Sequence, residues 1–75
     1  MEGELIGEEE LRNWFTYHAP DPSQLVQYAN IRQAALGFAQ VVLRNSPPSA
    51  DQTTAFRKIR EAVMIANASI ACGGK

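Results

Sequence analysis

The segment Asn45-Ser46-Pro47-Pro48 decides the fold of this 75-residue chain, because it separates two long stretches with helical periodicity. Two consecutive prolines remove backbone donors and clash with a continuing helix. Ser49 follows as a candidate N-cap, with Gln52 at the capping-box distance. The connection is about four residues long, which favours two antiparallel helices joined as a hairpin.

Upstream of these prolines, the pattern predicts a helix from about Pro22 to Arg44. Asp21 is the expected N-cap, Pro22 suits the first helical position, and Gln24 lies at the capping-box distance. Apolar side chains recur every three or four residues. These positions are Leu25, Tyr28, Ile31, Ala35, Phe38 and Val42.

Downstream, a second helix is expected from Ser49 until Gly73 and Gly74, which are typical helix terminators. Its apolar stripe is Phe56, Ile59, Val63, Ala66 and Ile70. Each helix is about 33 Å long at about 22 residues. Both stripes alternate spacings of three and four, so we expect them to face each other.

The N-terminal part predicts a short helix over about residues 7–15, with Leu11, Trp14 and Phe15 on one side. The segment His18-Ala19-Pro20-Asp21-Pro22 follows, and residues before prolines favour extended backbone. No stretch predicts a strand. We therefore expect an all-α single domain over residues 1–75, a short N-terminal helix plus a long antiparallel helical hairpin, with residues 1–10 as an acidic N-terminal extension.

Oligomerisation is the expected source of extra stability. A chain this short buries only about 60% of its unfolded surface. The single Cys72 cannot form an intramolecular disulfide, and one cysteine with one histidine argues against a zinc site. A helix that is apolar nearly all round is buried on more than one side. Large apolar residues lie off the two stripes at Val26, Leu36, Val41, Leu43, Met64 and Ile65.

The charge is unevenly distributed. Residues 1–10 carry five glutamates and no base, whereas the remainder carries seven bases and three acids, for a net charge of −1. Acids near a helix start favour the helix dipole, so a solvated helix start is the simplest interpretation. This balance argues against duplex DNA as a partner. No apolar run approaches the roughly 20 residues of a membrane span and no signal-peptide pattern is present, which favours an intracellular protein.

The sequence argues against an enzyme. Nucleophilic catalysis needs a nucleophile, a base and an orienting group, and spacing does not pair His18 with Cys72. Paired carboxylates and a phosphate-binding glycine loop are absent from the pattern. We therefore expect no catalytic residue, no metal and no cofactor.

Four polar residues stand out, and each has a structural alternative. His18 can donate to a backbone carbonyl and hold the turn, and Tyr17 can pack with its hydroxyl at the surface. Arg32 can pair with Glu61 across the hairpin. Asn67 can be a buried hydrogen-bonding residue that fixes the register of the helices.

A functional interpretation combines the same residues. An aromatic turn at residues 15–18 and an arginine on the following helix supply a stacking face and a phosphate clamp. That pair suits a nucleotide. At a two-fold interface every group appears twice, which would suit a ligand with two bases and two phosphates.

Four motifs occur together in this chain: Phe15-Thr16-Tyr17-His18-Ala19-Pro20, Tyr28 with Ile31-Arg32, Ser46-Pro47-Pro48-Ser49 and the segment Glu61–Ala71. In combination they resemble a family of small phage proteins that includes the anti-CBASS cyclic-oligonucleotide sponges, whose helical hairpin resembles one also found in an anti-Thoeris sponge. The similarity covers about residues 14–71. Ile65 stands where the family commonly has tryptophan, which leaves the pocket shape and ligand preference open.

The resemblance implies a homohexamer in the host cytoplasm that sequesters cyclic dinucleotides, such as cyclic GMP-AMP, without cleaving them. It extends the expected ligands to cyclic trinucleotides, held by some members in separate pockets, and to cyclic ADP-ribose variants. By position, Tyr17 would stack on a base and Arg32 would contact phosphate. The full set of expected ligand-binding residues is Phe15, Thr16, Tyr17, His18, Tyr28, Arg32 and Asn67.

Two other interpretations remain. One is a helical homo-oligomeric protein-interaction module with no nucleotide ligand, in which Arg32 is only an ion-pair partner. The other is a weak single-stranded nucleic-acid binder that uses Tyr17 and the bases Arg57, Lys58 and Arg60; its affinity would fall steeply with salt.

Overall fold

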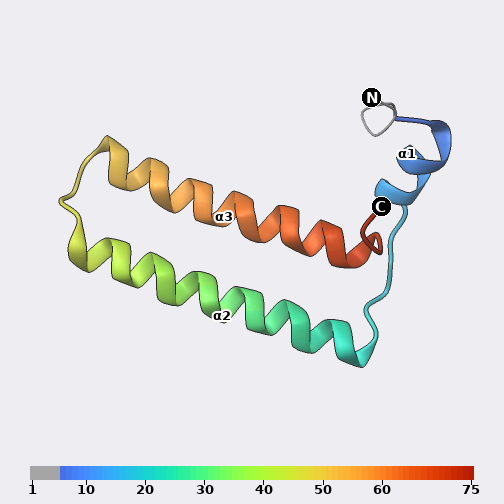
Figure 1. Ribbon diagram of the computed structural model, residues 1–75, viewed down its shortest axis with the longest axis horizontal. Coiled ribbons are helices and arrows are strands. Elements are labelled where there is room, and N and C mark those ends of the chain that lie inside the picture. Colours follow the sequence, from blue (N-terminus) through green and yellow to red (C-terminus); the bar gives the residue numbers. More distant parts are fainter. Residues whose placement is uncertain (1–5) are drawn as a thin grey trace.

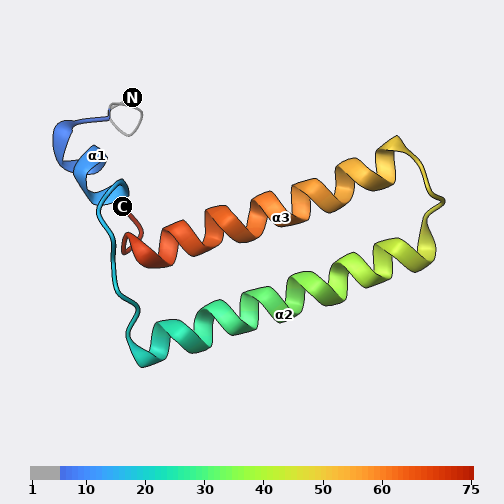
Figure 2. The same ribbon diagram turned by 180° about the vertical axis from the view of Figure 1, so that it is seen from behind.

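The computed structural model describes residues 6–75, and this range contains three helices and no strand. They are α1 (Glu8–Trp14), α2 (Pro22–Asn45) and α3 (Ala50–Ala71). The two long helices run antiparallel side by side, and α1 lies at the open end of the hairpin near the C-terminus (Figures 1 and 2). The predicted all-α hairpin is confirmed. Glu2 and Glu4 lie outside the described residues.

The start of α1 agrees with the interpretation of a solvated helix start. Glu8, Glu9 and Glu10 occupy its first turn and are exposed. The Glu10 side chain accepts a hydrogen bond from the Gly7 backbone N–H at 3.0 Å. Acidic side chains at this end interact favourably with the helix dipole.

The N-terminus of α2 has the predicted capping box. Oδ1 of Asp21 accepts the Gln24 backbone N–H at 2.9 Å, and Oε1 of Gln24 accepts the Asp21 N–H at 3.0 Å. The Ser23 hydroxyl also donates to Asp21, at 2.8 Å. The Gln24 N–H, and then the Ser23 hydroxyl, lower the pKa of Asp21 because they stabilise its carboxylate.

The start of α3 confirms half of its predicted cap. The Ser49 hydroxyl accepts the Gln52 backbone N–H at 3.1 Å. The Gln52 side chain does not return to Ser49 as a capping box requires; its Nε2 donates to the Ser46 carbonyl at 3.0 Å and to the Ser46 hydroxyl at 3.2 Å. Gln52 is the one buried residue in the described range, at 8% exposure. Its amide therefore ties the hairpin loop to α3.

The predicted end of α3 is also confirmed. Gly73 and Gly74 have φ angles of 67° and 78°, which is the left-handed region that glycine adopts without steric cost. The Gly74 N–H donates to the Ser69 carbonyl at 2.8 Å and closes the last turn.

The two predicted apolar stripes face each other, but the stripe of α2 is less well buried than the stripe of α3. All five stripe residues of α3 are half-buried, but Leu25 and Phe38 of α2 stay 56% and 59% exposed. Gln24 Nε2 donates to the Ile70 carbonyl at 3.4 Å, which fixes the register at the open end. The pair Gln52–Ser46 fixes it at the loop end.

The hairpin has no buried apolar side chain in its described part. The chain exposes 6150 Å², against about 4,500 Å² for a compact protein of its mass. Its radius of gyration is 15.7 Å, against about 11 Å for a compact domain of this length. The off-stripe residues Val26, Leu36, Val41, Leu43, Met64 and Ile65 are all more than half exposed.

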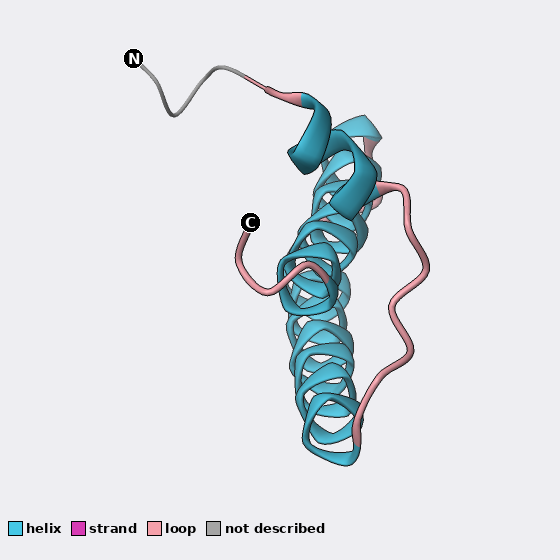
Figure 3. Ribbon diagram, turned by 90° about the vertical axis from the view of Figure 1, so that its right-hand side faces the viewer, coloured by secondary structure: helices cyan, strands magenta, loops and turns pink. Residues whose placement is uncertain are grey.

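The first helix is attached to the end of α3 through two side-chain hydrogen bonds, which we call the α1 clasp. Asn13 Nδ2 donates to the Cys72 carbonyl at 3.1 Å, and Trp14 Nε1 donates to the Lys75 carbonyl at 2.9 Å. The linker from α1 to α2 runs along the open end of the hairpin (Figure 3). No helix in the described range is long and apolar enough to traverse a bilayer.

Candidate functional site

The linker after α1 presents two aromatic rings to solvent. Phe15 is 84% exposed and Tyr17 is 85% exposed. Between them, the Thr16 hydroxyl donates to the Arg12 carbonyl, one turn back. The Tyr17 ring is largely unpacked against residues 6–75, contrary to its structural alternative, and is accessible to a stacking partner.

His18 holds this linker in place. Its Nε2 lies 2.7 Å from the Asn13 carbonyl oxygen. A carbonyl only accepts hydrogen bonds, so Nε2 must carry the proton. This geometry matches the structural alternative for His18: it donates to a backbone carbonyl and positions Tyr17 beside it.

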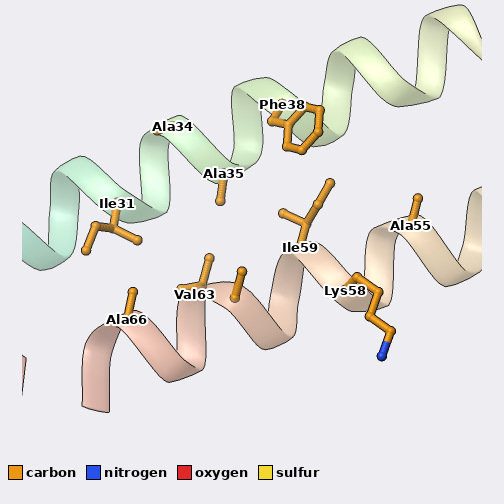
Figure 4. Close-up of a pocket in the computed structure, with 10 residues that line it drawn as sticks. Ile31, Ala34, Ala35, Phe38, Ala55, Lys58, Ile59, Val63 and Ala66 are labelled. Carbon is orange, nitrogen blue, oxygen red and sulfur yellow. The ribbon is translucent and has the colours of Figure 1, made fainter. Parts of the chain in front are cut away.

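The two long helices form a layer with a groove on each face. The first groove has a volume of about 680 Å³ and is almost entirely apolar. In Figure 4 its Ile31, Ala35, Ile59 and Val63 side chains point into the space between α2 and α3, and Lys58 points away from α2. Alanines make the groove shallow; its lining includes Ala34, Ala35, Ala55, Ala62 and Ala66.

The second groove, of about 360 Å³, lies on the opposite face. It shares Ala35, Ile59 and Val63 with the first groove, and these three residues form the seam between the helices. The residues that line only the second groove are Arg32, Leu36, Ala39, Phe56, Arg60 and Met64. This groove therefore combines an apolar floor with two guanidinium groups.

The predicted alternative pairing of Arg32 with Glu61 is not formed. Glu61 instead lies 3.7 Å from Lys58 on its own helix. Glu61 is two residues from both Ile59 and Val63, a rotation of about 200° that directs it away from the seam. In the described part of the chain, Arg32 and Arg60 form no ion pair.

Tyr28 and Asn67 lie on the same face as the second groove. Tyr28 is one turn before Arg32, and Asn67 is two turns after Arg60. Both residues are half-buried. The Asn67 Oδ1 atom is inaccessible to solvent and has no hydrogen-bond partner, so the register-fixing role is not fulfilled by this acceptor. An unpaired buried acceptor is costly unless another molecule supplies a donor.

The helical spacing thus places Tyr28, Arg32 and Asn67 on one face of the hairpin, whereas Tyr17 lies in the linker before α2. Tyr17 precedes α2, whereas Arg32 is ten residues into that helix, about 15 Å along its axis from Pro22. No hydrogen bond, ion pair or shared groove joins Tyr17 to Arg32 within residues 6–75. Within one protomer, Tyr17 and Arg32 therefore line no common groove.

Sequence reasoning did not identify the α1 clasp, nor that Arg60 lines the same groove as Arg32. The clasp leaves no sequence signal because its acceptors are backbone carbonyls 59 and 61 residues away. Arg60 is signalled only by its spacing: it falls three residues before Val63 and so stays near the seam. Within residues 6–75, no three His, Cys, Asp or Glu side chains gather where they could hold a metal ion.

A family model described as Acb2/Tad1, hairpin domain, matches residues 7–71. The matched range contains α1, α2 and α3 and every expected ligand-binding residue. No curated protein and no solved structure gives a significant match.

Proposed function

The chain belongs to the Acb2/Tad1 hairpin-domain family, and from this membership we propose that it is a phage sponge protein acting in the host cytoplasm. It binds cyclic dinucleotide second messengers of bacterial anti-phage signalling, such as cyclic GMP-AMP, and sequesters them without cleavage. Cyclic trinucleotides and cyclic ADP-ribose variants are the related ligands that belong in the same test.

The observation that carries this proposal is Arg32 without an ion-pair partner in a groove with an apolar floor. A guanidinium without a carboxylate partner is ready to bind phosphate, and its planar fork matches two phosphate oxygens. Tyr28 lies on the same face, where its ring can contact a base, and Asn67 follows on that face of α3.

Assembly of several copies completes the pocket. The excess surface and the absence of a buried apolar core support burial of the hairpin faces against other copies. We propose a homohexamer in which the linker of one protomer places Tyr17 beside Arg32 of another. At a two-fold interface this arrangement supplies two aromatic rings and two guanidinium groups.

The energetics of such a pocket suffice for a sponge. Sequestration requires affinity above that of the host effector, and nanomolar binding corresponds to about −12 kcal/mol. Stacking on an aromatic side chain contributes about 1–3 kcal/mol per base. A hydrogen bond to a charged group contributes about 1.5–3 kcal/mol. Two stacks and two charged hydrogen bonds sum to about 5–12 kcal/mol; the upper end reaches this value, and bidentate contacts to phosphate would add further hydrogen bonds.

The placement of the reactive groups supports binding without cleavage. The His18 proton is committed to the Asn13 carbonyl, and Cys72 lies at the C-cap of α3. Neither side chain lines the second groove. Within residues 6–75 of one protomer, no histidine, cysteine or carboxylate lines the groove that would hold the phosphates.

A calorimetric titration with cyclic GMP-AMP tests the proposal, followed by heat release and chromatography of the ligand. We expect tight binding and recovery of intact ligand. Recovery of a linear product would contradict sequestration. Absence of binding across cyclic dinucleotides, cyclic trinucleotides and cyclic ADP-ribose variants would leave the oligomeric protein-interaction module as the better interpretation.

A further inference from the structure

We propose that Arg60 is a second phosphate-binding residue, which acts with Arg32 in the second groove on the doubly charged ring of the ligand; this inference rests on the proposed function. Arg32 comes from α2 and Arg60 from α3, so the two helices each contribute one guanidinium to one groove. Both side chains are exposed and neither has an ion-pair partner within residues 6–75.

The surroundings of the two arginines favour an anion. Among residues 6–75, no carboxylate lines the second groove, and Glu61 lies beside Lys58 outside it. Two like charges that share a groove repel each other, and an anion that contacts both relieves this repulsion. The floor of alanine and valine side chains lowers the local dielectric and so strengthens each charged contact.

The number of charges favours a cyclic dinucleotide. Its ring carries two phosphodiester groups with one negative charge each, and at the proposed two-fold interface each of these groups would meet one Arg32 and one Arg60. Phe56 and Met64 also line this groove, and an aromatic ring and a thioether are suitable neighbours for a base. Thus both the polar and the apolar parts of the lining fit this ligand class.

The same geometry distinguishes Arg60 from the other bases of α3. Arg57 and Lys58 do not line the second groove, although they are close in sequence. A nonspecific nucleic-acid surface would use all three bases together. Arg57→Ala is therefore a matched control: it removes the same charge from the same helix without changing the groove.

The test compares the full-length chain with its Arg60→Ala, Arg60→Lys and Arg57→Ala variants by calorimetric titration with cyclic GMP-AMP at two salt concentrations. Mass in solution is measured for each. We expect Arg60→Ala to weaken binding about 10- to 100-fold, Arg60→Lys to restore part of it, and Arg57→Ala to match the parent. The affinity of Arg60→Ala should also fall less steeply with salt. All masses should be equal.

Three results would overturn the assignment: unchanged binding by Arg60→Ala, an equal loss in Arg57→Ala, or a changed mass that places Arg60 in the protomer interface. If the parent chain binds no cyclic nucleotide, the proposed function fails separately. Titration of the parent chain and Arg60→Ala with inorganic pyrophosphate then tests whether the second groove binds anions through both arginines. Weaker binding by Arg60→Ala would support a two-arginine anion site, and equal or absent binding would refute it.

Discussion

His18 and Asn13 are joined by a 2.7 Å contact between the imidazole Nε2 and the backbone carbonyl oxygen. The same carbonyl also accepts the Cys72 thiol at 3.8 Å. One backbone atom of α1 thus receives donors from the linker and from the end of α3. His18 therefore sets where the exposed Tyr17 ring stands relative to the hairpin.

Replacing His18 with alanine should loosen the linker without unfolding the hairpin. We expect faster hydrogen exchange at residues 15–19 and unchanged exchange in α2 and α3, because their own hydrogen bonds are not touched. Ligand affinity should fall through loss of Tyr17 positioning. Unchanged exchange in the linker would show that the Asn13 contact does not restrain it.

Tyr17→Ala should weaken cyclic dinucleotide binding by about 1–3 kcal/mol for each ring that stacks on a base. Phe15→Ala is the comparison, since Phe15 is equally exposed on the same linker. Calorimetry on both variants separates the two rings. A larger loss in Phe15→Ala would assign the stacking role to Phe15 instead.

Arg32→Glu should abolish ligand binding and leave the assembly intact, because it places a negative charge where phosphate is expected. Arg44→Glu makes the same charge change at the far end of α2, outside both grooves. Titration and mass measurement on both variants provide the test. Normal binding by a folded, oligomeric Arg32→Glu protein would remove Arg32 from the site.

Ala62→Glu should disrupt the assembly, because it introduces a charge into the apolar first groove. Thr54→Glu is the control: Thr54 is exposed on the outer side of α3, and its hydroxyl only bonds the Ala50 carbonyl. Sedimentation velocity compares their masses. Equal masses for the two variants and the parent would show that the first groove is not an interface.

Acid should weaken the start of α2 through Asp21. Its pKa is lower in the folded chain than the reference value of 3.8. The stabilisation is therefore present above the unfolded pKa and is lost as pH falls through the folded pKa. Asp21→Asn keeps a good N-cap that does not titrate. Chemical denaturation between pH 5 and pH 2 should show a smaller acid-induced loss in Asp21→Asn than in the parent; parallel curves would contradict this.

Local signals made most of the fold predictable. Prolines 47 and 48, the Asp21 and Ser49 caps and the glycine pair at 73–74 all act on neighbouring backbone, and each element boundary follows from them. The predicted capping box at Gln52 is not formed, because the amide of Gln52 donates instead to the carbonyl and the hydroxyl of Ser46. The Ser46 carbonyl, exposed by the prolines that follow, competes successfully with the cap.

The candidate site was less predictable, for geometric reasons. Spacing places Tyr28 and Arg32 on one face, but the direction of Glu61 depends on the helix rotation that packs Ile59 and Val63 at the seam. The relation between Tyr17 and Arg32 could not be predicted from spacing, because Tyr17 lies in the linker before α2 and shares no groove with Arg32 in the described chain.

The α1 clasp constrains the backbone of the C-terminal segment more than its side chains. Both of its acceptors are backbone carbonyls, so the side chains at positions 72 and 75 can be exchanged without altering the hydrogen bonds from Asn13 and Trp14. Gly73 and Gly74 lack this freedom because their φ angles are positive. Substitutions at positions 72 and 75 should therefore leave these hydrogen bonds in place, whereas positions 73 and 74 should stay glycine. The aromatic linker keeps its attachment point in either case.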